Sequence, residues 1–172
     1  MLNHLVDYDG VLVAPRKFSE FRLFEGVGEV VKRLKDSGIA IGVATNQPEI
    51  TRGGLKGHEL ELMMRALRRE ISVDDVRVCP HQDGDGCACR KPQPGMLLDL
   101  MRSCGADSAR SVMVGDTWKD IEAGKRAQCA TILVSNGSSD ALGADAVVRS
   151  LSEAADLILA GFCQAKRPLG GR

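Results

Sequence analysis

The chain has 172 residues and a mass of 18.5 kDa, which is the size of one ordinary domain. Its 23 basic and 23 acidic residues cancel, and only 3% of its residues are aromatic. The balanced charge argues against a dedicated nucleic-acid or polyanion binder, and the scarcity of aromatic rings argues against a base-stacking surface. With 44% hydrophobic and 27% charged residues, the composition is that of a globular chain, neither disordered nor membrane-embedded.

Short apolar runs alternate with amphipathic segments along the chain. Apolar residues recur at helical spacing from Val27 to Leu34, and Pro94 and Gly105 stand where a helix typically begins and ends. In chain order we expect a strand at 2–6, a helix at 26–37, a strand at 39–44, a helix around 60–67, a strand at 76–79, a helix at 94–104, a strand at 111–115, a helix at 118–128, strands at 130–134 and 146–148, and a helix at 151–162.

This alternation predicts an α/β fold with a mostly parallel sheet. We expect one domain over residues 1–165 and a frayed tail over 166–172. No charge-free stretch approaches the ~20 residues of a membrane span, and the N-terminus lacks the pattern of a secretory signal. We therefore expect a cytoplasmic monomer with reduced thiols that binds neither membrane nor nucleic acid.

Ligands bind beyond the carboxyl ends of the strands in open α/β sheets, so the residues at those ends matter most. Carboxylates side by side at the end of a buried strand are costly without a cation between them. The predicted ends carry acids, a hydroxyl, an amide and a lysine, which should converge on one edge of the sheet. In chain order they are Asp7, Asp9, Thr45, Asn46, Lys91, Asp116 and Asp120.

These residues form an ordered pattern: Asp-x-Asp-Gly, an apolar strand with Thr, Lys-Pro, and Gly-Asp-x-x-x-Asp. From Asp7 to Asp120 the pattern resembles the haloacid dehalogenase (HAD) superfamily of phosphohydrolases. The resemblance implies a three-layer Rossmann-like fold with Asp7 as the nucleophile and Asp9 as the general acid and base. Each residue alone also has a structural explanation, such as a turn, a buried hydroxyl or a helix N-cap.

The resemblance also implies the groups that hold phosphate and metal. Thr45 and groups near Asn46 would bind the phosphoryl oxygens, and Lys91 would neutralise charge. Mg²⁺ would bind Asp7, the carbonyl of Asp9 and Asp116, with Asp120 in support. Like charges ~4 Å apart cost about 4 kcal/mol at an effective dielectric near 20, so a phosphate cannot approach these acids without a cation.

A cysteine–histidine loop occupies residues 79–89. Cys79, His81, Cys87 and Cys89 make a Cys₃His set, which fills the tetrahedral shell of a structural Zn²⁺. Turn-forming residues between the two pairs let them fold back on each other. The alternative is ordinary cytosolic thiols, whereas an EF-hand fails because its later ligands are missing. We expect the other cysteines, at 104, 129 and 163, to be core residues.

The zinc loop resembles the HAD branch that contains heptose 1,7-bisphosphate 7-phosphatases and histidinol-phosphate phosphatases. The Thr-Asn-Gln segment followed by Arg52-Gly53 resembles the heptose enzymes, whereas the five residues between His81 and Cys87 are nearer to the histidinol-phosphate enzymes. Thr117 stands where heptose enzymes often have a basic residue, for which Lys119 or Arg16 would compensate. The candidates for gripping a distal anionic or sugar group are Arg52 and Arg90.

The segments between the motifs are too short for a lid domain. Between Asp9 and Thr45 there is room for one helix, one strand and a flap, so the protein should be capless. A small phosphorylated sugar or metabolite is the expected substrate, with heptose bisphosphate ahead of histidinol phosphate. Capless sites also admit macromolecular ends, so a polynucleotide 3′-phosphatase is a competitor. A non-catalytic zinc-stabilised binding module is another.

Overall fold

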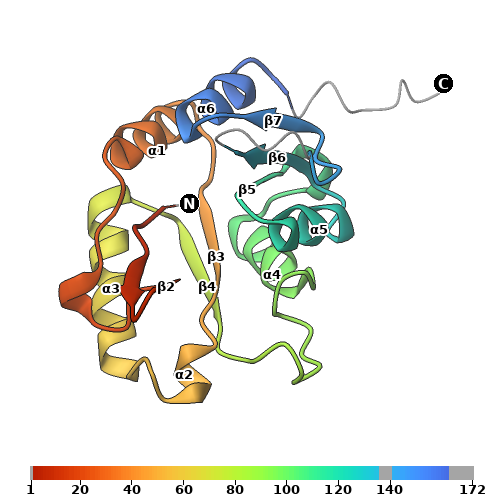
Figure 1. Cartoon of the computed structure of the whole chain (residues 1–172). Coiled ribbons are helices and arrows are strands. Elements are labelled where there is room, and N and C mark those ends of the chain that lie inside the picture. Colours follow the sequence, from red (N-terminus) through yellow and green to blue (C-terminus); the bar gives the residue numbers. More distant parts are fainter. Residues whose placement is uncertain (1, 136–140, 163–172) are drawn as a thin grey trace, which may run out of the picture.

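The computed structural model describes residues 2–135 and 141–162 (Figure 1). Cys163 and the expected tail at 166–172 lie outside these residues. In chain order the elements are β1 Val6–Tyr8, β2 Val11–Val13, the 3₁₀ helix η1 Phe18–Glu20, α1 Val27–Asp36, β3 Gly42–Asn46, α2 Glu49–Arg52, α3 Gly57–Ile71, β4 Asp75–Cys79, α4 Gly95–Cys104, the 3₁₀ helix η2 Ser108–Arg110, β5 Val112–Gly115, α5 Trp118–Arg126, β6 Ala130–Val134, β7 Ala146–Val148 and α6 Leu151–Leu159.

The expected helices are present, with ends that differ from the predictions by a few residues. In α1 the residues at helical spacing are buried, and Gly38 follows with a φ of 77°. In α4, Pro94 precedes the first turn and Gly105 ends the helix in the left-handed region. The sequence analysis missed only the short helix α2 among the α-helices of the described residues.

The strands after the first hairpin are parallel, as predicted. β3 pairs with β4, and β5 pairs with β6, which pairs with β7. β3 and β4 run through the middle of Figure 1, while β5, β6 and β7 lie to their right. The chain thus has the α/β architecture expected from the alternating pattern.

Alternate side chains on β3 point into two different cores. Val43 packs in the cluster formed by α1 and α3, whereas Ala44 packs in the cluster formed by α4 and α5. On β5, Met113 likewise faces the α4–α5 cluster and its neighbours Val112 and Val114 face α6. Because successive side chains of a strand point to opposite faces, this division defines three layers, with helices on both sides of the strands.

The first strand differs from the prediction. We expected a strand at 2–6 within the parallel sheet, but β1 begins at Val6 and pairs antiparallel with β2. Asp9 and Gly10 join them with φ values of 54° and 82°, and an Asp-Gly pair with two positive φ values makes a tight hairpin turn. The local turn therefore pairs β1 with the residues that follow it, and in this structure β1 pairs with neither β3 nor β5.

The hairpin is held against the rest of the molecule by polar contacts of Tyr8, which precedes its turn, and of Arg16, which follows β2. The Tyr8 hydroxyl donates to Glu20 at 2.6 Å, and the Arg16 guanidinium lies 4.7 Å from the Tyr8 ring centroid. Arg16 also pairs with Glu49 of α2 at 2.8 Å. Since α2 follows β3 directly, the hairpin is tied to the segment beyond the carboxyl end of β3.

The segments between the motifs are short, as expected for a capless protein. From Asp9 to Thr45 the structure has β2, η1 and α1, and from Thr45 to Lys91 it has α2, α3 and β4. Within 2–135 these elements leave no chain for a separate lid. No helix among the described residues has the length and apolar character needed to cross a membrane.

Candidate functional site

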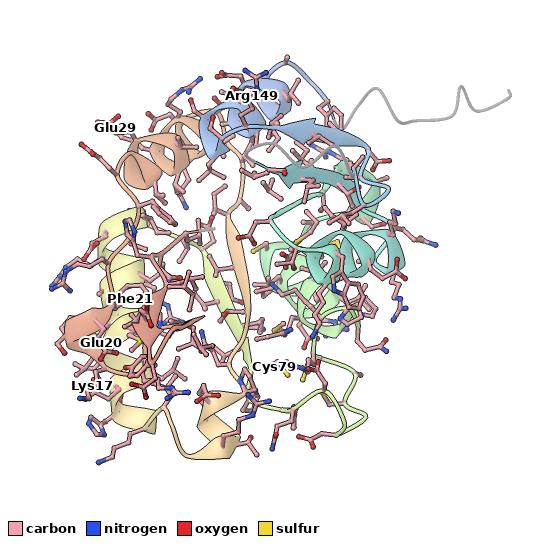
Figure 2. All side chains as sticks on the ribbon, in the orientation of Figure 1. Lys17, Glu20, Phe21, Glu29, Cys79 and Arg149 are labelled. Atoms are coloured by element: carbon pink, nitrogen blue, oxygen red, sulfur yellow. The ribbon has the colours of Figure 1, made fainter. Side chains whose placement is uncertain are left out.

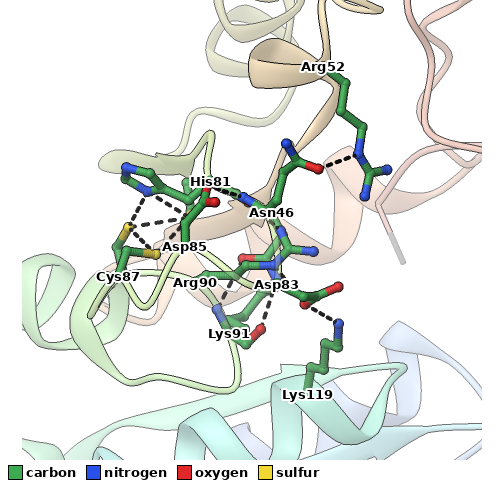
Figure 3. Close-up of polar contacts among 12 residues, drawn as sticks. Asn46, Arg52, His81, Asp83, Asp85, Cys87, Arg90, Lys91 and Lys119 are labelled. Carbon is green, nitrogen blue, oxygen red and sulfur yellow. Dashed lines mark hydrogen bonds and ion pairs between the residues drawn. The ribbon is translucent and has the colours of Figure 1, made fainter.

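Two loops meet at the carboxyl end of β3. The Asn46 side chain donates from Nδ2 to the Lys91 carbonyl at 3.0 Å, and its Oδ1 accepts from the Lys91 backbone N–H at 3.1 Å (Figure 3). Thr45 Oγ1 accepts from the side chain of Gln47 at 3.0 Å. These two hydrogen bonds of the Asn46 amide fix the segment around Lys91 against the end of β3, where the sequence predicts the site.

Lys91 places a largely enclosed cation at this edge. Its Nζ donates to the Ala44 carbonyl at 2.7 Å and lies 2.6 Å from Asp120 Oδ1. The Lys91 and Asp120 side chains are only 12% and 7% exposed. This ion pair joins the β3 edge to α5, so two of the predicted site residues are in direct contact.

Asp120 is held from its own helix as well. Its Oδ2 accepts from the Thr117 backbone N–H at 3.1 Å and from the Thr117 hydroxyl at 2.7 Å, which caps the start of α5. A Cβ on Gly115 would lie 2.2 Å from the Asp120 Cβ, so only glycine fits before Asp116.

Burial raises the pKa of Asp120, but the charge of Lys91 and the hydrogen bonds from Lys91 and Thr117 outweigh the effect of burial. The pKa of Asp120 is therefore below its ordinary value.

Replacing Lys91 by methionine should destabilise the fold because it leaves the Asp120 carboxylate buried without its cation. We expect a loss of about 3 kcal/mol in the free energy of unfolding at pH 7, measured by urea denaturation. The pKa of Asp120 is lowered in the folded protein, so its contribution is present above its ordinary value of 3.8 and lost as the pH falls through the lowered pKa. The variant should therefore approach the wild type in stability at acid pH.

The exposed pair Lys32–Asp36 supplies the control, since its side chains are 74% and 63% exposed. Lys32→Met should cost less than about 1 kcal/mol. A Lys91→Met cost no larger than that of Lys32→Met would contradict the assignment of a buried pair.

The remaining predicted acids are exposed, unlike Asp120. Asp116 follows the end of β5 and is exposed. Asp7 and Asp9 are exposed on the β1–β2 hairpin, where Asp7 Oδ1 accepts from the Gly10 N–H at 2.7 Å. Because the Asp-Gly turn pairs β1 with β2, the strand that carries Asp7 is not hydrogen-bonded to β3, which ends at Thr45 and Asn46.

The cysteine–histidine loop does come together as predicted. The Sγ atoms of Cys79, Cys87 and Cys89 and Nδ1 of His81 all lie within 4.8 Å of one another. In Figure 2 sulfur atoms gather beside the Cys79 label, beyond the end of β4. These side chains could hold a metal ion.

The spacing of the four atoms matches a tetrahedral shell. The Sγ–Sγ distances are 3.2, 3.5 and 3.8 Å, and the His81 nitrogen lies 3.5 Å from Cys79 and 3.3 Å from Cys89. A tetrahedron with Zn–S bonds of about 2.3 Å has edges of about 3.8 Å. Burial, and then contact with the other two thiols, raises the pKa of Cys89 to about 12, a value that an ion would lower because ligating thiols deprotonate.

Cys104 and Cys129 are half-buried, whereas Cys79 is buried. Cys129 packs at the edge of the α4–α5 core, and Cys104 ends α4. Neither is fully buried, so the expectation that they are core residues holds only in part. Cys163 lies outside the described residues.

Arg52 and Arg90, the candidates for gripping a distal group, already have acidic or amide partners, and so does Lys119, one of the two bases expected to compensate for Thr117. Arg90 donates to Asp83 at 2.8 Å and to the His81 carbonyl at 2.9 Å, and Lys119 donates to the same Asp83 oxygen at 2.8 Å. Arg52 donates to Gln82 and Glu49. The sequence analysis did not single out Asp83, since an ion pair between a loop and a distant helix leaves no local pattern.

A groove of about 470 Å³ opens elsewhere, between the 18–28 segment and α3. Phe18, Phe21 and Phe24 line much of it, together with Arg22 and Glu70. None of the predicted site residues lines this groove.

Parallel strands with helices on both sides and polar residues beyond their carboxyl ends define a Rossmann-like α/β protein. A family model described as HAD-hydrolase-like matches residues 88–162. Proteins named D-glycero-beta-D-manno-heptose-1,7-bisphosphate 7-phosphatase from Bordetella bronchiseptica and Photorhabdus laumondii are 34% and 32% identical over 137 and 168 residues. These alignments cover 77% and 90% of this chain and 75% and 86% of the relatives.

A third protein with that name, from Pseudomonas aeruginosa, is 39% identical over 114 residues, which are 63% of this chain and 64% of the relative. Among solved structures, the D,D-heptose 1,7-bisphosphate phosphatase of B. bronchiseptica, complexed with magnesium and phosphate, superposes with a TM-score of 0.77 at 30% identity. The match covers 91% of this chain and 93% of that one. The chain belongs to the HAD-like hydrolases, and these relatives are phosphatases.

Proposed function

We propose that this chain is a Mg²⁺-dependent phosphomonoesterase that removes the 7-phosphate of D-glycero-D-manno-heptose 1,7-bisphosphate. The observation that carries the proposal is the largely enclosed Lys91 ammonium, fixed between the Ala44 carbonyl and Asp120 at the carboxyl end of β3. A rigid cation at that edge suits a phosphate group, and relatives aligned over 77% and 90% of this chain are named for this sugar bisphosphate.

In the proposed reaction a carboxylate oxygen of Asp7 attacks the phosphorus, and the bond to the sugar oxygen breaks. Asp9 gives its proton to that leaving oxygen and then takes a proton from the water that hydrolyses the aspartyl-phosphate. Thr45 and Asn46 orient the phosphoryl oxygens and Lys91 offsets their charge. The step requires the β1–β2 hairpin to bring Asp7 against a phosphate bound at Lys91, and the Arg16–Glu49 contact already ties the hairpin to that side of β3.

The donor set at the strand ends fits Mg²⁺, because it consists of carboxylate and carbonyl oxygens. Asp7, the Asp9 carbonyl and Asp116 would hold the ion, with Asp120 behind them. Bound there, Mg²⁺ would neutralise the charge between phosphate and acids. The Cys₃His set fits Zn²⁺ in a closed, structural site. Reduced thiol ligands also agree with a cytoplasmic location.

Histidinol phosphate is the second candidate substrate. The five residues between His81 and Cys87 and the neutral Thr117 after Asp116 favour it over a bisphosphate. Lys119, the second residue of α5, favours the bisphosphate because its ammonium and the Arg90 guanidinium share one anionic partner, Asp83.

A phosphate-release assay with Mg²⁺ tests the proposal. The two anomers of heptose 1,7-bisphosphate, histidinol phosphate, a 3′-phosphorylated oligonucleotide and p-nitrophenyl phosphate are compared at equal concentration. We expect the highest kcat/KM with one heptose anomer. Preference for the oligonucleotide would overturn the sugar substrate, and no release from any compound would favour a binding module.

A further inference from the structure

One carboxylate oxygen joins two cations beside the proposed phosphate site. Asp83 Oδ1 lies 2.8 Å from Arg90 Nε and 2.8 Å from Lys119 Nζ (Figure 3). The first cation comes from the end of the cysteine–histidine loop and the second from α5. Two basic side chains from different elements thus converge on one negatively charged atom.

This arrangement adjoins the Lys91–Asp120 pair. Arg90 directly precedes Lys91 in the chain, and Lys119 directly precedes Asp120. Lys91 Nζ and Asp120 Oδ1 are 2.6 Å apart. Neighbouring Cα atoms are about 3.8 Å apart, so the backbones that carry Arg90 and Lys119 adjoin those that carry Lys91 and Asp120. A small sugar with phosphates at both ends is long enough to touch both places.

The three partners differ in how firmly they are held. The Arg90 side chain is 10% exposed and also donates to the His81 carbonyl, and Lys119 is 29% exposed. The Asp83 side chain is 62% exposed. The cations are therefore the fixed part of the arrangement, and the carboxylate is the part that can turn into solvent at little cost.

We propose that Asp83 is a specificity-determining residue, whose carboxylate occupies an anion site made by Arg90 and Lys119 and competes there with the second phosphate of a bisphosphate substrate. The inference rests on the proposed function. A phosphate monoester carries nearly two charges and three acceptor oxygens, so it displaces a carboxylate from two donors. A substrate with one phosphate leaves the internal ion pairs intact.

The experiment compares heptose 1,7-bisphosphate with heptose 7-phosphate, which differ only in the second phosphate. In Asp83→Asn we expect the KM ratio of monophosphate to bisphosphate to rise about five- to twenty-fold, because the competitor of the bisphosphate has lost its charge. The matched control is Asp85→Asn, which removes an exposed charge from the same loop, where the carboxylate accepts a hydrogen bond from the Gln82 N–H at 2.8 Å. Its ratio should stay within about two-fold of wild type.

Lys119→Met in the Asp83→Asn background should cancel the rise in the KM ratio of monophosphate to bisphosphate. Zinc content is measured for every variant. A ratio that is unchanged or lower in Asp83→Asn, or an equal rise in Asp85→Asn, overturns the proposal. Calorimetric titration of Asp7→Asn, with and without Asp83→Asn, gives the same comparison without turnover. It therefore decides the role of Asp83 even if no substrate releases phosphate, a result that would refute only the proposed function.

Discussion

Asp7→Asn is expected to lower phosphate release at least about 10³-fold, because an amide oxygen cannot form the aspartyl-phosphate. The substitution should leave the fold intact. Asp7 is exposed, and its Oδ1 accepts one hydrogen bond from the Gly10 N–H, which the asparagine Oδ1 can also accept. Steady-state kinetics with the best substrate of the panel, together with thermal unfolding, measures both effects.

Two further variants separate nucleophilic attack from simple loss of charge. Asp7→Glu keeps the charge but displaces the carboxylate, and it should lose activity nearly as severely. Asp36→Asn removes an exposed acid from the end of α1 and should keep wild-type kinetics. Acid-quenched wild type should carry a phosphoryl group by mass spectrometry, and Asp7→Asn should not. If Asp7→Asn kept more than a tenth of the wild-type rate, another group would have to be the nucleophile.

Much of the fold was predictable because it depends on repeating local patterns. The helical spacing from Val27 to Leu34 and the glycine after α4 gave helices close to those observed. The rule that parallel strands end at one edge brought Lys91 and Asp120 into one site, where they form an ion pair. The Cys₃His set was predictable because its four members lie within one loop.

The failures have a different physical origin. The Asp9-Gly10 pair served in the sequence analysis only as part of a catalytic pattern, although the same two residues favour a tight hairpin that pairs β1 with β2. Arg90 and Lys119 looked free to bind substrate, but both meet Asp83. Such partners depend on how distant segments pack, which spacing along the chain does not encode.

Loss of the zinc ion proposed for the cysteine–histidine loop is the second change for which we expect a large effect. The loop leads directly into Arg90 and Lys91, and the Arg90 guanidinium donates to the carbonyl of His81, one of the proposed zinc ligands. Cys89→Ser should therefore abolish stoichiometric zinc binding, lower Tm by about 10 °C or more and lower kcat/KM at least about tenfold. Elemental analysis, thermal unfolding and phosphate release measure the three changes.

Cys104→Ser is the control, since it alters a half-buried thiol at the end of α4 outside the metal set. It should retain one zinc ion per chain and near wild-type kinetics. The argument for a structural ion requires the three losses to occur together, because four protein ligands leave no position for a reacting water. Zinc-free Cys89→Ser with wild-type Tm would show that the loop keeps its shape through its hydrogen bonds alone. Loss of activity with Tm unchanged would instead assign the ion a direct part in the reaction.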